Sequence, residues 1–169
     1  MAKTRAAITV LGDGGWGTTL AIHLYRLGHQ ATLWSAFPAY ARTLDRRREN
    51  TKFLPGIPIP KALPITADLP AAVRDAEVVI LAIPSQYLRG VVRRLRHRHK
   101  PKAIFLSVAK GLERGSLKRM SQVVQEELGA VRLAVLSGPN IAVEIAKNQP
   151  AISVVAAREP RLAAKVQRL

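Results

Sequence analysis

The chain alternates between short runs of apolar, often β-branched residues and longer stretches in which apolar and polar positions follow a helical spacing. The short runs are apolar at nearly every position, which is typical of parallel strands buried on both faces. They predict strands at 6–11, 30–34, 63–66, 78–83, 103–108, 132–136 and 152–156. The segments between them predict helices at 17–27, 38–48, 71–74, 86–98, 117–128, 141–147 and 160–169. This alternation predicts a doubly wound α/β fold, with a mostly parallel sheet and helices on both of its faces.

Two segments depart from this alternation. Residues 50–64 contain four prolines, which predict an extended excursion between the second helix and the third strand. In the last predicted helix Leu162, Val166 and Leu169 form an apolar stripe, and no glycine follows to cap the helix. We therefore expect residues 1–169 to form one domain whose final helix leads into a further segment.

The segment 12–17, Gly-Asp-Gly-Gly-Trp-Gly, follows the first predicted strand and opens the first predicted helix. This is the context in which the pattern G-x-G-x-x-G binds a dinucleotide. Gly12 allows a tight turn, Gly14 lets a pyrophosphate approach the backbone, and Gly17 lets the helix pack closely on the sheet. The free N–H groups of the helix N-terminus would face the phosphates. The sequence thus predicts a Rossmann-like, dinucleotide-binding domain, and the alternative is a glycine-rich turn without a ligand.

The end of the second strand bears on the choice between NAD and NADP. An acid there accepts hydrogen bonds from the ribose hydroxyls of NAD, but this strand is followed by Ser35, Ala36 and Phe37. The basic residues that come next are Arg42 and the arginines at 46–48, and an arginine nearby can bind a 2′-phosphate. The sequence therefore favours NADP, although we expect at least two of the arginines at 46–48 only to form a solvent-exposed helix face.

Three further residues follow predicted strands at the carboxyl edge of the sheet, where open α/β sheets bind their ligands. Lys110 is a cation suited to a phosphate or carboxylate group. Gly138 offers a backbone N–H that no side chain obstructs, and the amide of Asn140 can donate to a ligand or accept from it. The simpler alternatives are an ordinary surface lysine at position 110 and a helix cap at Asn140.

Four motifs together carry a resemblance to a known family. They are Gly-Asp-Gly-Gly-Trp-Gly-Thr-Thr-Leu at 12–20, Arg47…Asn50…Phe53-Leu-Pro-Gly ending at 56, Lys-Gly-Leu-Glu at 110–113 and Leu-Ser-Gly-Pro-Asn-Ile-Ala-Val-Glu at 136–144. In this order and spacing the chain resembles the NAD(P)-dependent glycerol-3-phosphate dehydrogenases along almost its whole length. The last two motifs are the specific ones, and they argue against a hydroxyacid or sugar-acid dehydrogenase with a similar nucleotide domain.

The resemblance implies an oxidoreductase that transfers hydride reversibly between a nicotinamide cofactor and the pair glycerol 3-phosphate and dihydroxyacetone phosphate, which feeds glycerophospholipid synthesis. It implies that NADP or NAD is bound by Gly12, Gly14, Gly15, Trp16, Gly17, Phe53, Tyr87, Lys110 and Ala142. It implies that the phosphorylated substrate is contacted by Lys110, Gly138 and Asn140. The family commonly has a basic residue or histidine where this chain has Ala36, which weakens the argument for NADP.

The resemblance also implies a part that these 169 residues do not contain. The family has a second, helical domain that supplies the general-base lysine and most ligands of the substrate phosphate, and no residue here matches that lysine. Oxidation of an alcohol requires a base within hydrogen-bond reach of the hydroxyl proton. We therefore expect the cofactor-binding half, without a catalytic residue of its own and with little or no turnover. The resemblance leaves open a homodimer in the full-length enzyme.

The charge of the chain raises one alternative function. Lys and Arg number 27 against 11 acidic residues, for a formal net charge of +16, and residues 93–102 are densely basic, as in a nucleic-acid-binding module. No aromatic residues are interleaved there for base stacking, so we expect a solvent-exposed basic helix end and no specific nucleic-acid partner. A noncatalytic dinucleotide-binding domain is a further alternative.

The composition excludes other classes. The chain has no cysteine, which rules out disulfides and thiolate chemistry and suits the cytoplasm. Its four histidines form no cluster with acidic residues, so we expect no metal. No apolar run approaches the roughly 18 residues of a membrane-spanning helix, so we expect no membrane span.

Overall fold

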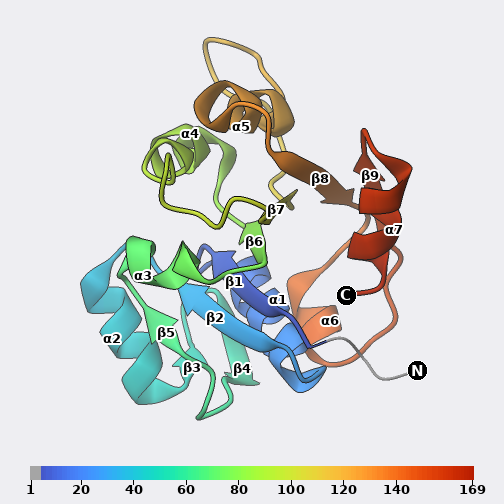
Figure 1. Ribbon diagram of the computed structural model, residues 1–169. Helices are drawn as coiled ribbons and strands as arrows, with labels where there is room; N and C mark the ends of the chain where they lie inside the picture. The colour runs from blue at the N-terminus through green and yellow to red at the C-terminus, as the bar shows by residue number, and fades with distance from the viewer. Residues whose placement is uncertain (1–4) are drawn as a thin grey trace.

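A seven-stranded sheet forms the centre of the computed structural model, which describes residues 5–169 (Figure 1). Its spatial order is β5-β2-β1-β6-β7-β8-β9, where the strands are β1 (Ala7–Leu11), β2 (Gln30–Trp34), β5 (Ile65–Thr66), β6 (Val78–Leu81), β7 (Ile104–Ser107), β8 (Arg132–Ser137) and β9 (Val154–Ala157). All neighbouring pairs are parallel except β8 and β9. Because β1 lies between β2 and β6, the strand order reverses there, which confirms the doubly wound, mostly parallel fold.

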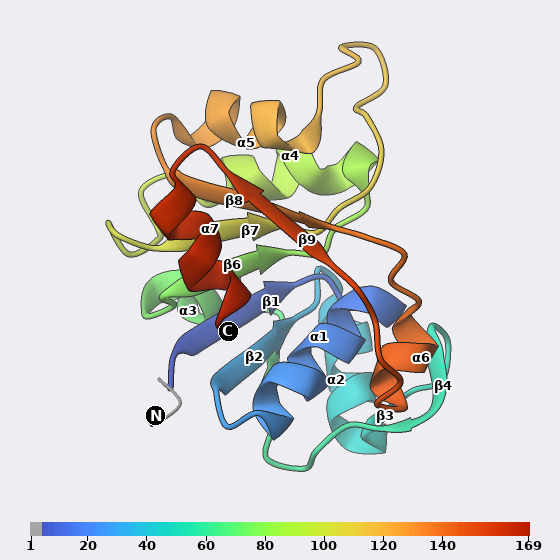
Figure 2. The same cartoon turned by 90° about the vertical axis from the view of Figure 1, so that its right-hand side faces the viewer.

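Helices cover both faces of the sheet (Figure 2). One face carries α1 (Gly15–Arg26), α6 (Ala142–Ala146) and α7 (Pro160–Gln167), and the other carries α3 (Leu69–Arg74), α4 (Ser85–Arg93) and α5 (Met120–Leu128). The central strands feed a separate apolar core on each side, so that Val10 and Ile80 join the first core and Leu11 and Leu81 the second. The remaining helix, α2 (Pro38–Arg47), packs beside β5.

The proline-rich segment 50–64 contains a hairpin that the sequence pattern does not predict. Its strands, β3 (Glu49–Asn50) and β4 (Leu54–Pro58), pair antiparallel. Leu54 and Ile57 are buried against the α1 side of the sheet, whereas the prolines at 55 and 58 are exposed. A two-stranded ribbon tolerates proline because a strand with a free edge needs no ladder hydrogen bond on that side.

The last strand runs antiparallel to its neighbour, a detail of the mostly parallel sheet that the sequence pattern does not predict. After β8 the chain forms only the five-residue α6, which packs on α1; the Thr19 hydroxyl donates to the carbonyl oxygen of Ala142 at 3.1 Å. A parallel strand would require a crossover that returns the chain to the opposite end of the sheet. Because α6 stays at the carboxyl end of β8, β9 enters the sheet from that end.

Two predicted helices have different ends in the structure. The helix predicted at 86–98 stops at Arg93, and turns follow in which His97 takes the left-handed conformation (φ +58°). The helix predicted at 117–128 begins only at Met120, because Leu117 is also left-handed (φ +55°). Among residues 5–169, no helix is long and apolar enough to cross a membrane.

The apolar stripe of α7 is buried within this chain. Leu162 and Val166 are buried in the core beneath the sheet, and Leu169 packs against the same core. The stripe is therefore buried against the chain's own sheet, and the expectation that the final helix leads into a further segment stays a prediction.

Candidate functional site

The glycine turn lies where β1 ends and α1 begins, and close packing leaves no room for a Cβ at three of its glycines, Gly12, Gly15 and Gly17. Gly12 has a φ of +123°, and a Cβ there would overlap the carbonyl oxygen of Ala82, which follows β6. A Cβ on Gly17 would overlap the carbonyl oxygen of Gly12. These contacts bring the backbone of α1 closer to β1 and β6 than any larger residue would permit.

Gly14 differs, because no atom of residues 5–169 lies within 4 Å of the position that its Cβ would occupy. Its extended backbone (φ −67°, ψ 175°) suits any residue, so the fold itself does not require glycine here. Gly14 is the N-cap of α1, no side chain caps the helix, and the first turn contains no acidic residue. The free N–H groups and partial positive charge of this helix end therefore fit the pyrophosphate of a dinucleotide.

The side chain of Asn50 joins the glycine turn to the β3–β4 hairpin through hydrogen bonds. Its buried side-chain amide donates to the carbonyl oxygen of Asp13 at 2.8 Å and to the hydroxyl of Thr18 at 2.7 Å. Its Oδ1 accepts from the Tyr40 hydroxyl at 2.7 Å and from the backbone N–H of Phe53 at 3.1 Å. Sequence reasoning included Asn50 only as part of a motif, and its structural role becomes visible only in the folded chain.

The hairpin and α6 place two of the expected cofactor residues beside the glycine turn. A Cβ on Gly15 would lie 2.5 Å from the carbonyl oxygen of Phe53 and 3.8 Å from the Cβ of Ala142. The ring of Phe53 is 46% exposed, so an aromatic surface borders the turn. Trp16 packs against the α1-side core, and Tyr87, in the first turn of α4, is 71% exposed. Phe53 and Ala142 are therefore at the turn, while Tyr87 lies at the start of α4, which packs on the other face of the sheet from α1.

The three expected substrate residues come together at the carboxyl ends of β7 and β8. The Lys110 ammonium donates to the carbonyl oxygen of Gly138 at 3.1 Å, and that oxygen also accepts from the backbone N–H of Asn140 at 2.8 Å. The side-chain oxygen of Asn140 accepts from Ser153 at 2.9 Å, so this side chain does not cap α6. Its Nδ2 is buried and makes no hydrogen bond within residues 5–169, and a buried donor of this kind is costly unless a ligand or water accepts from it.

The loop that follows Lys110 is held by ion pairs to α4. Arg89 donates to both carboxylate oxygens of Glu113 at 2.7 Å, and it also contacts Glu126 at 2.9 Å and Glu127 at 2.8 Å. The hydrogen bonds that Glu113 accepts from Arg89, and then the one from Ser116, lower the pKa of Glu113 to about 2. The glutamate of the Lys-Gly-Leu-Glu motif therefore fixes the Lys110 loop against α4, a role that sequence reasoning did not assign.

Some of the basic residues at 93–102, at the end of α4 and after it, form ion pairs within the chain. Arg93 and Arg96 both contact the buried carboxylate of Glu127, at 3.1 Å and 2.9 Å. Hydrogen bonds from Arg93 and then Arg89 lower the pKa of Glu127 to about 2. These two arginines thus join the C-terminal end of α4 and the turn after it to α5, while their side chains stay half-exposed or more, as expected of a solvent-exposed basic helix end.

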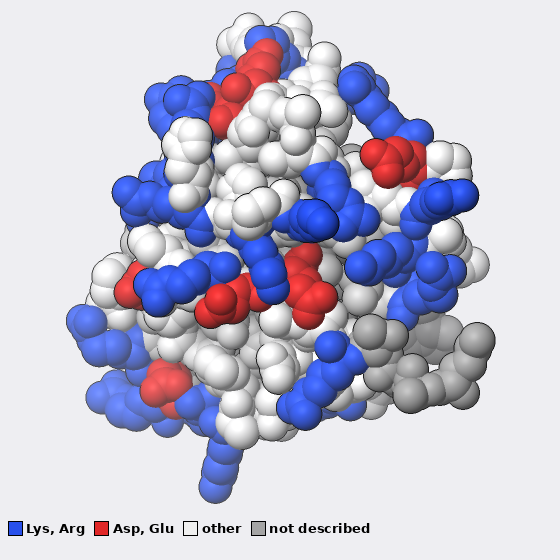
Figure 3. Space-filling model, viewed as in Figure 1, with Lys and Arg blue, Asp and Glu red and all other residues white. Residues whose placement is uncertain are grey.

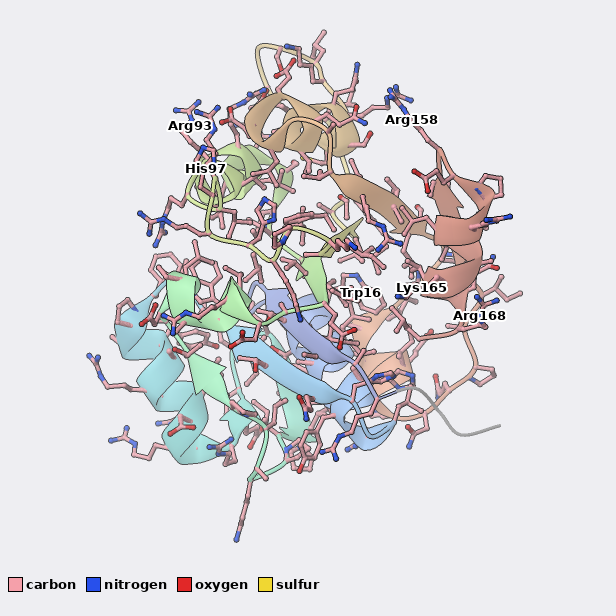
Figure 4. All side chains as sticks on the ribbon, viewed as in Figure 1. Trp16, Arg93, His97, Arg158, Lys165 and Arg168 are labelled. Atoms are coloured by element: carbon pink, nitrogen blue, oxygen red, sulfur yellow. The ribbon has the colours of Figure 1, made fainter. Side chains whose placement is uncertain are left out.

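On the face seen in Figure 3, the remaining cations do not form one continuous surface. Lys and Arg are scattered over the visible face in Figure 3, interspersed with uncharged residues. Figure 4 shows Arg93 and His97 at the outer end of α4, away from Trp16 and the glycine turn. The absence of a specific nucleic-acid partner stays a prediction.

Comparison with known proteins identifies the family. Residues 7–163 match the family model described as NAD-dependent glycerol-3-phosphate dehydrogenase N-terminus. The glycerol-3-phosphate dehydrogenase (NAD(P)+) of Corynebacterium glutamicum is 42% identical over 163 residues, which cover 95% of this chain and 49% of that protein. This chain belongs to the NAD-dependent glycerol-3-phosphate dehydrogenase family.

Other members of the glycerol-3-phosphate dehydrogenase family agree in sequence and in structure. The protein of Prosthecochloris aestuarii is 42% identical over 165 residues, which cover 96% of this chain and 50% of that protein. The crystal structure of glycerol-3-phosphate dehydrogenase from Coxiella burnetii has a TM-score of 0.90 and 32% identity, and the match covers 98% of this chain and 51% of that one. The chain spans about half the length of the curated relatives that it matches.

Proposed function

We propose that this chain is the cofactor-binding half of a glycerol-3-phosphate dehydrogenase, which interconverts glycerol 3-phosphate and dihydroxyacetone phosphate. The observation that carries the proposal is the pairing of two sites at one edge of the sheet. One is the open cradle at Gly14, and the other is the cluster of Lys110, Gly138 and Asn140. Family membership supports the combination, because both sites lie in the segment that matches the family.

In this proposal the glycine turn holds the cofactor. Gly12 and Gly17 set the backbone path, and the N–H groups at Gly14, Gly15 and Trp16 bind the pyrophosphate at the start of α1. Phe53, Tyr87 and Ala142 line the bound dinucleotide, and Lys110 reaches both cofactor and substrate. The bound nicotinamide supplies or accepts the hydride.

The substrate contacts follow from the chemistry of the second cluster. Lys110 offers a positive charge to the phosphate or the oxygen of the reacting carbon, and its bond to the carbonyl oxygen of Gly138 fixes where that charge stands. The buried Nδ2 of Asn140 has a proton to donate to a substrate oxygen. These residues orient an anionic substrate but do not accept the hydroxyl proton.

The general base belongs, in this proposal, to a second, helical domain that packs against the β8–β9 end of the sheet. Apolar residues are exposed there, including Ile152 at 78% and Val154 at 65%. A hollow of about 430 Å³ lies between α5 and these strands, with Leu133, Val135 and Ala156 on the strand side and polar residues, among them Gln122, Gln125 and Arg158, around them. A homodimer and a cytoplasmic location, both expected from the sequence, stay predictions.

The test is a pair of calorimetric titrations with NADH and NADPH, followed by a turnover assay. We expect the 169-residue chain to bind at least one cofactor at micromolar to millimolar concentration, and to oxidise it negligibly with dihydroxyacetone phosphate. Adding the separately expressed second half of the Corynebacterium glutamicum relative should raise the rate, and Lys110→Met should lower the restored rate. Lys102→Met, an exposed lysine elsewhere, is the matched control.

Three outcomes would count against the proposal. No binding of either cofactor at millimolar concentration would refute the cofactor site. Rapid turnover by the chain alone would refute the assignment of the base to a second domain. Binding that never leads to turnover, with a second half that is shown to associate, would favour a noncatalytic dinucleotide-binding domain.

A further inference from the structure

The carboxylate of Asp13 lies at the end of β2, although Asp13 belongs to the glycine turn. The hydroxyl of Ser35, the first residue after β2, donates to this carboxylate, and Ser35 itself is buried. The Ser35 oxygen also accepts from the backbone N–H of Phe37 at 3.2 Å, and its hydroxyl has a second, more distant acceptor in the carbonyl oxygen of Phe37 at 3.2 Å, so the Asp13 carboxylate is the nearer of its two acceptors. A negative charge thus stands at the strand end where the sequence shows no acid.

We propose that Asp13 is the specificity-determining residue for the cofactor, accepting a hydrogen bond from the adenosine ribose of NAD and repelling the 2′-phosphate of NADP. This inference rests on the proposed cofactor site. In Rossmann domains the group that recognises the ribose hydroxyls is a carboxylate near the end of the second strand. Here Ser35 occupies that position in the sequence, and Asp13 supplies the carboxylate in space.

The carboxylate is available for this role. None of the ion pairs between the described residues involves Asp13, so its charge is not neutralised by a neighbouring lysine or arginine. Its backbone is fixed by Asn50, which donates to the Asp13 carbonyl oxygen at 2.8 Å. Its charge is also felt by Tyr40, whose pKa is raised by burial and, second, by Asp13. The side chain is therefore held in place with acceptor capacity to spare.

The arginines that favour NADP in the sequence are less well placed than Asp13 to meet the 2′ position of the adenosine ribose. Arg48 is engaged elsewhere, since it donates to the carbonyl oxygens of Leu63 at 2.8 Å and Pro60 at 3.3 Å and pairs with Asp45. The arginines at 46 and 47 lie at the C-terminal end of α2, roughly 12 Å along the helix from the end that adjoins β2. Arg42 is exposed on α2, one turn into the helix. The position after Ser35 is an alanine, whose side chain has no donor or charge for a phosphate.

The experiment compares ligands that differ only in the 2′-phosphate. Calorimetry would give the dissociation constants of NADH and NADPH, and of ADP-ribose and 2′-phospho-ADP-ribose, which lack the nicotinamide chemistry. A hydrogen bond to a charged group and the loss of a like-charge repulsion together predict a preference of at least about tenfold for the ligands without the phosphate. This preference would run against the net charge of +16, which attracts the more anionic ligand.

Asp13→Asn keeps the side-chain shape and the acceptor for Ser35 but removes the charge. We expect it to reduce the preference about tenfold or more, mainly by tightening the binding of the phosphorylated ligands. Asp45→Asn removes the same charge from the exposed face of α2 and should leave the ratio unchanged. Circular dichroism would show that both variants are folded. If Asp13→Asn does not fold, the ratio measured on the unaltered chain still decides.

The outcomes separate the inference from the proposed function. Equal binding of the paired ligands by the unaltered chain, a preference for the phosphorylated ones, or the same ratio in Asp13→Asn would overturn the role of Asp13 and leave the cofactor site intact. Failure of all four ligands to bind at millimolar concentration would overturn both.

Discussion

Substitution of Gly14 by valine separates the binding role of the glycine turn from its folding role. A Cβ at this position meets no atom within 4 Å, and the backbone angles suit valine. Replacing glycine by valine at an N-cap costs up to about 1 kcal/mol, and the reduced freedom of the unfolded chain returns about 0.4–1 kcal/mol. We therefore expect the free energy of unfolding of Gly14→Val to stay within about 1 kcal/mol of the unaltered chain.

Binding should suffer far more than stability. The valine side chain would fill the space in which a pyrophosphate meets the N–H groups of α1. A hydrogen bond to a charged group contributes about 1.5–3 kcal/mol, so the loss of two raises the dissociation constant by roughly 100-fold or more. Calorimetric titration with NADH and thermal unfolding followed by circular dichroism measure the two effects separately.

A second glycine provides the control. Gly90, within α4, also has nothing within 4 Å of a Cβ, but it lies away from the turn. Gly90→Ala should stabilise the helix by about 0.5–1 kcal/mol and leave NADH binding unchanged. An unchanged dissociation constant in Gly14→Val would refute the cradle, and a loss of stability of several kcal/mol would refute the geometry deduced at Gly14.

Three other expectations concern stability. Gly17→Ala should lower the free energy of unfolding by about 2–3 kcal/mol in urea titrations, because a Cβ would overlap a backbone carbonyl that can move only with the sheet; an unchanged value would contradict this. Asn50→Ala should cost about 2–3 kcal/mol in the same assay, since buried partners lose their hydrogen bonds, and a loss under 0.5 kcal/mol would argue against the anchor. The pKa values of Glu113 and Glu127 are held near 2, so the stability they contribute should be complete above pH 4.5 and lost as the pH falls towards 2; Glu127→Gln should flatten that part of the profile.

The fold was largely readable from the sequence because its central strands are buried on both faces. Such strands are apolar at nearly every position, and the glycines at 12–17 identify the first turn. The direction of β9 was not readable, because it depends on α6 packing against α1 rather than crossing the sheet. The hairpin around Asn50 was hidden because its prolines weaken any strand pattern.

The sequence predicts those parts of the candidate site in which a single residue supplies the chemistry. It does not predict the parts that depend on a contact between two residues far apart in the chain. Lys110 and Asn140 follow strands, and the edge of an open sheet brings such residues together. The bond between Asp13 and Ser35 joins two residues whose separation in sequence gives no sign of contact. The contacts of Arg89 with Glu113 and Glu127 likewise depend on how α4 packs on α5. Contacts of this kind are set by tertiary packing, which no local pattern encodes.

The central place of β1 has a consequence for how the chain folds. Ile8 pairs with Val78, so the first strand to be synthesised gains its second neighbour only after a long stretch of chain has followed. Ala82, whose carbonyl oxygen lies against Gly12, is synthesised after Val78. Such distant pairing slows folding, and a ligand that binds only the finished turn stabilises only the assembled sheet. We expect added dinucleotide to slow unfolding and to leave the early steps of refolding unchanged. The cofactor would then stabilise the domain only after the whole sheet has formed.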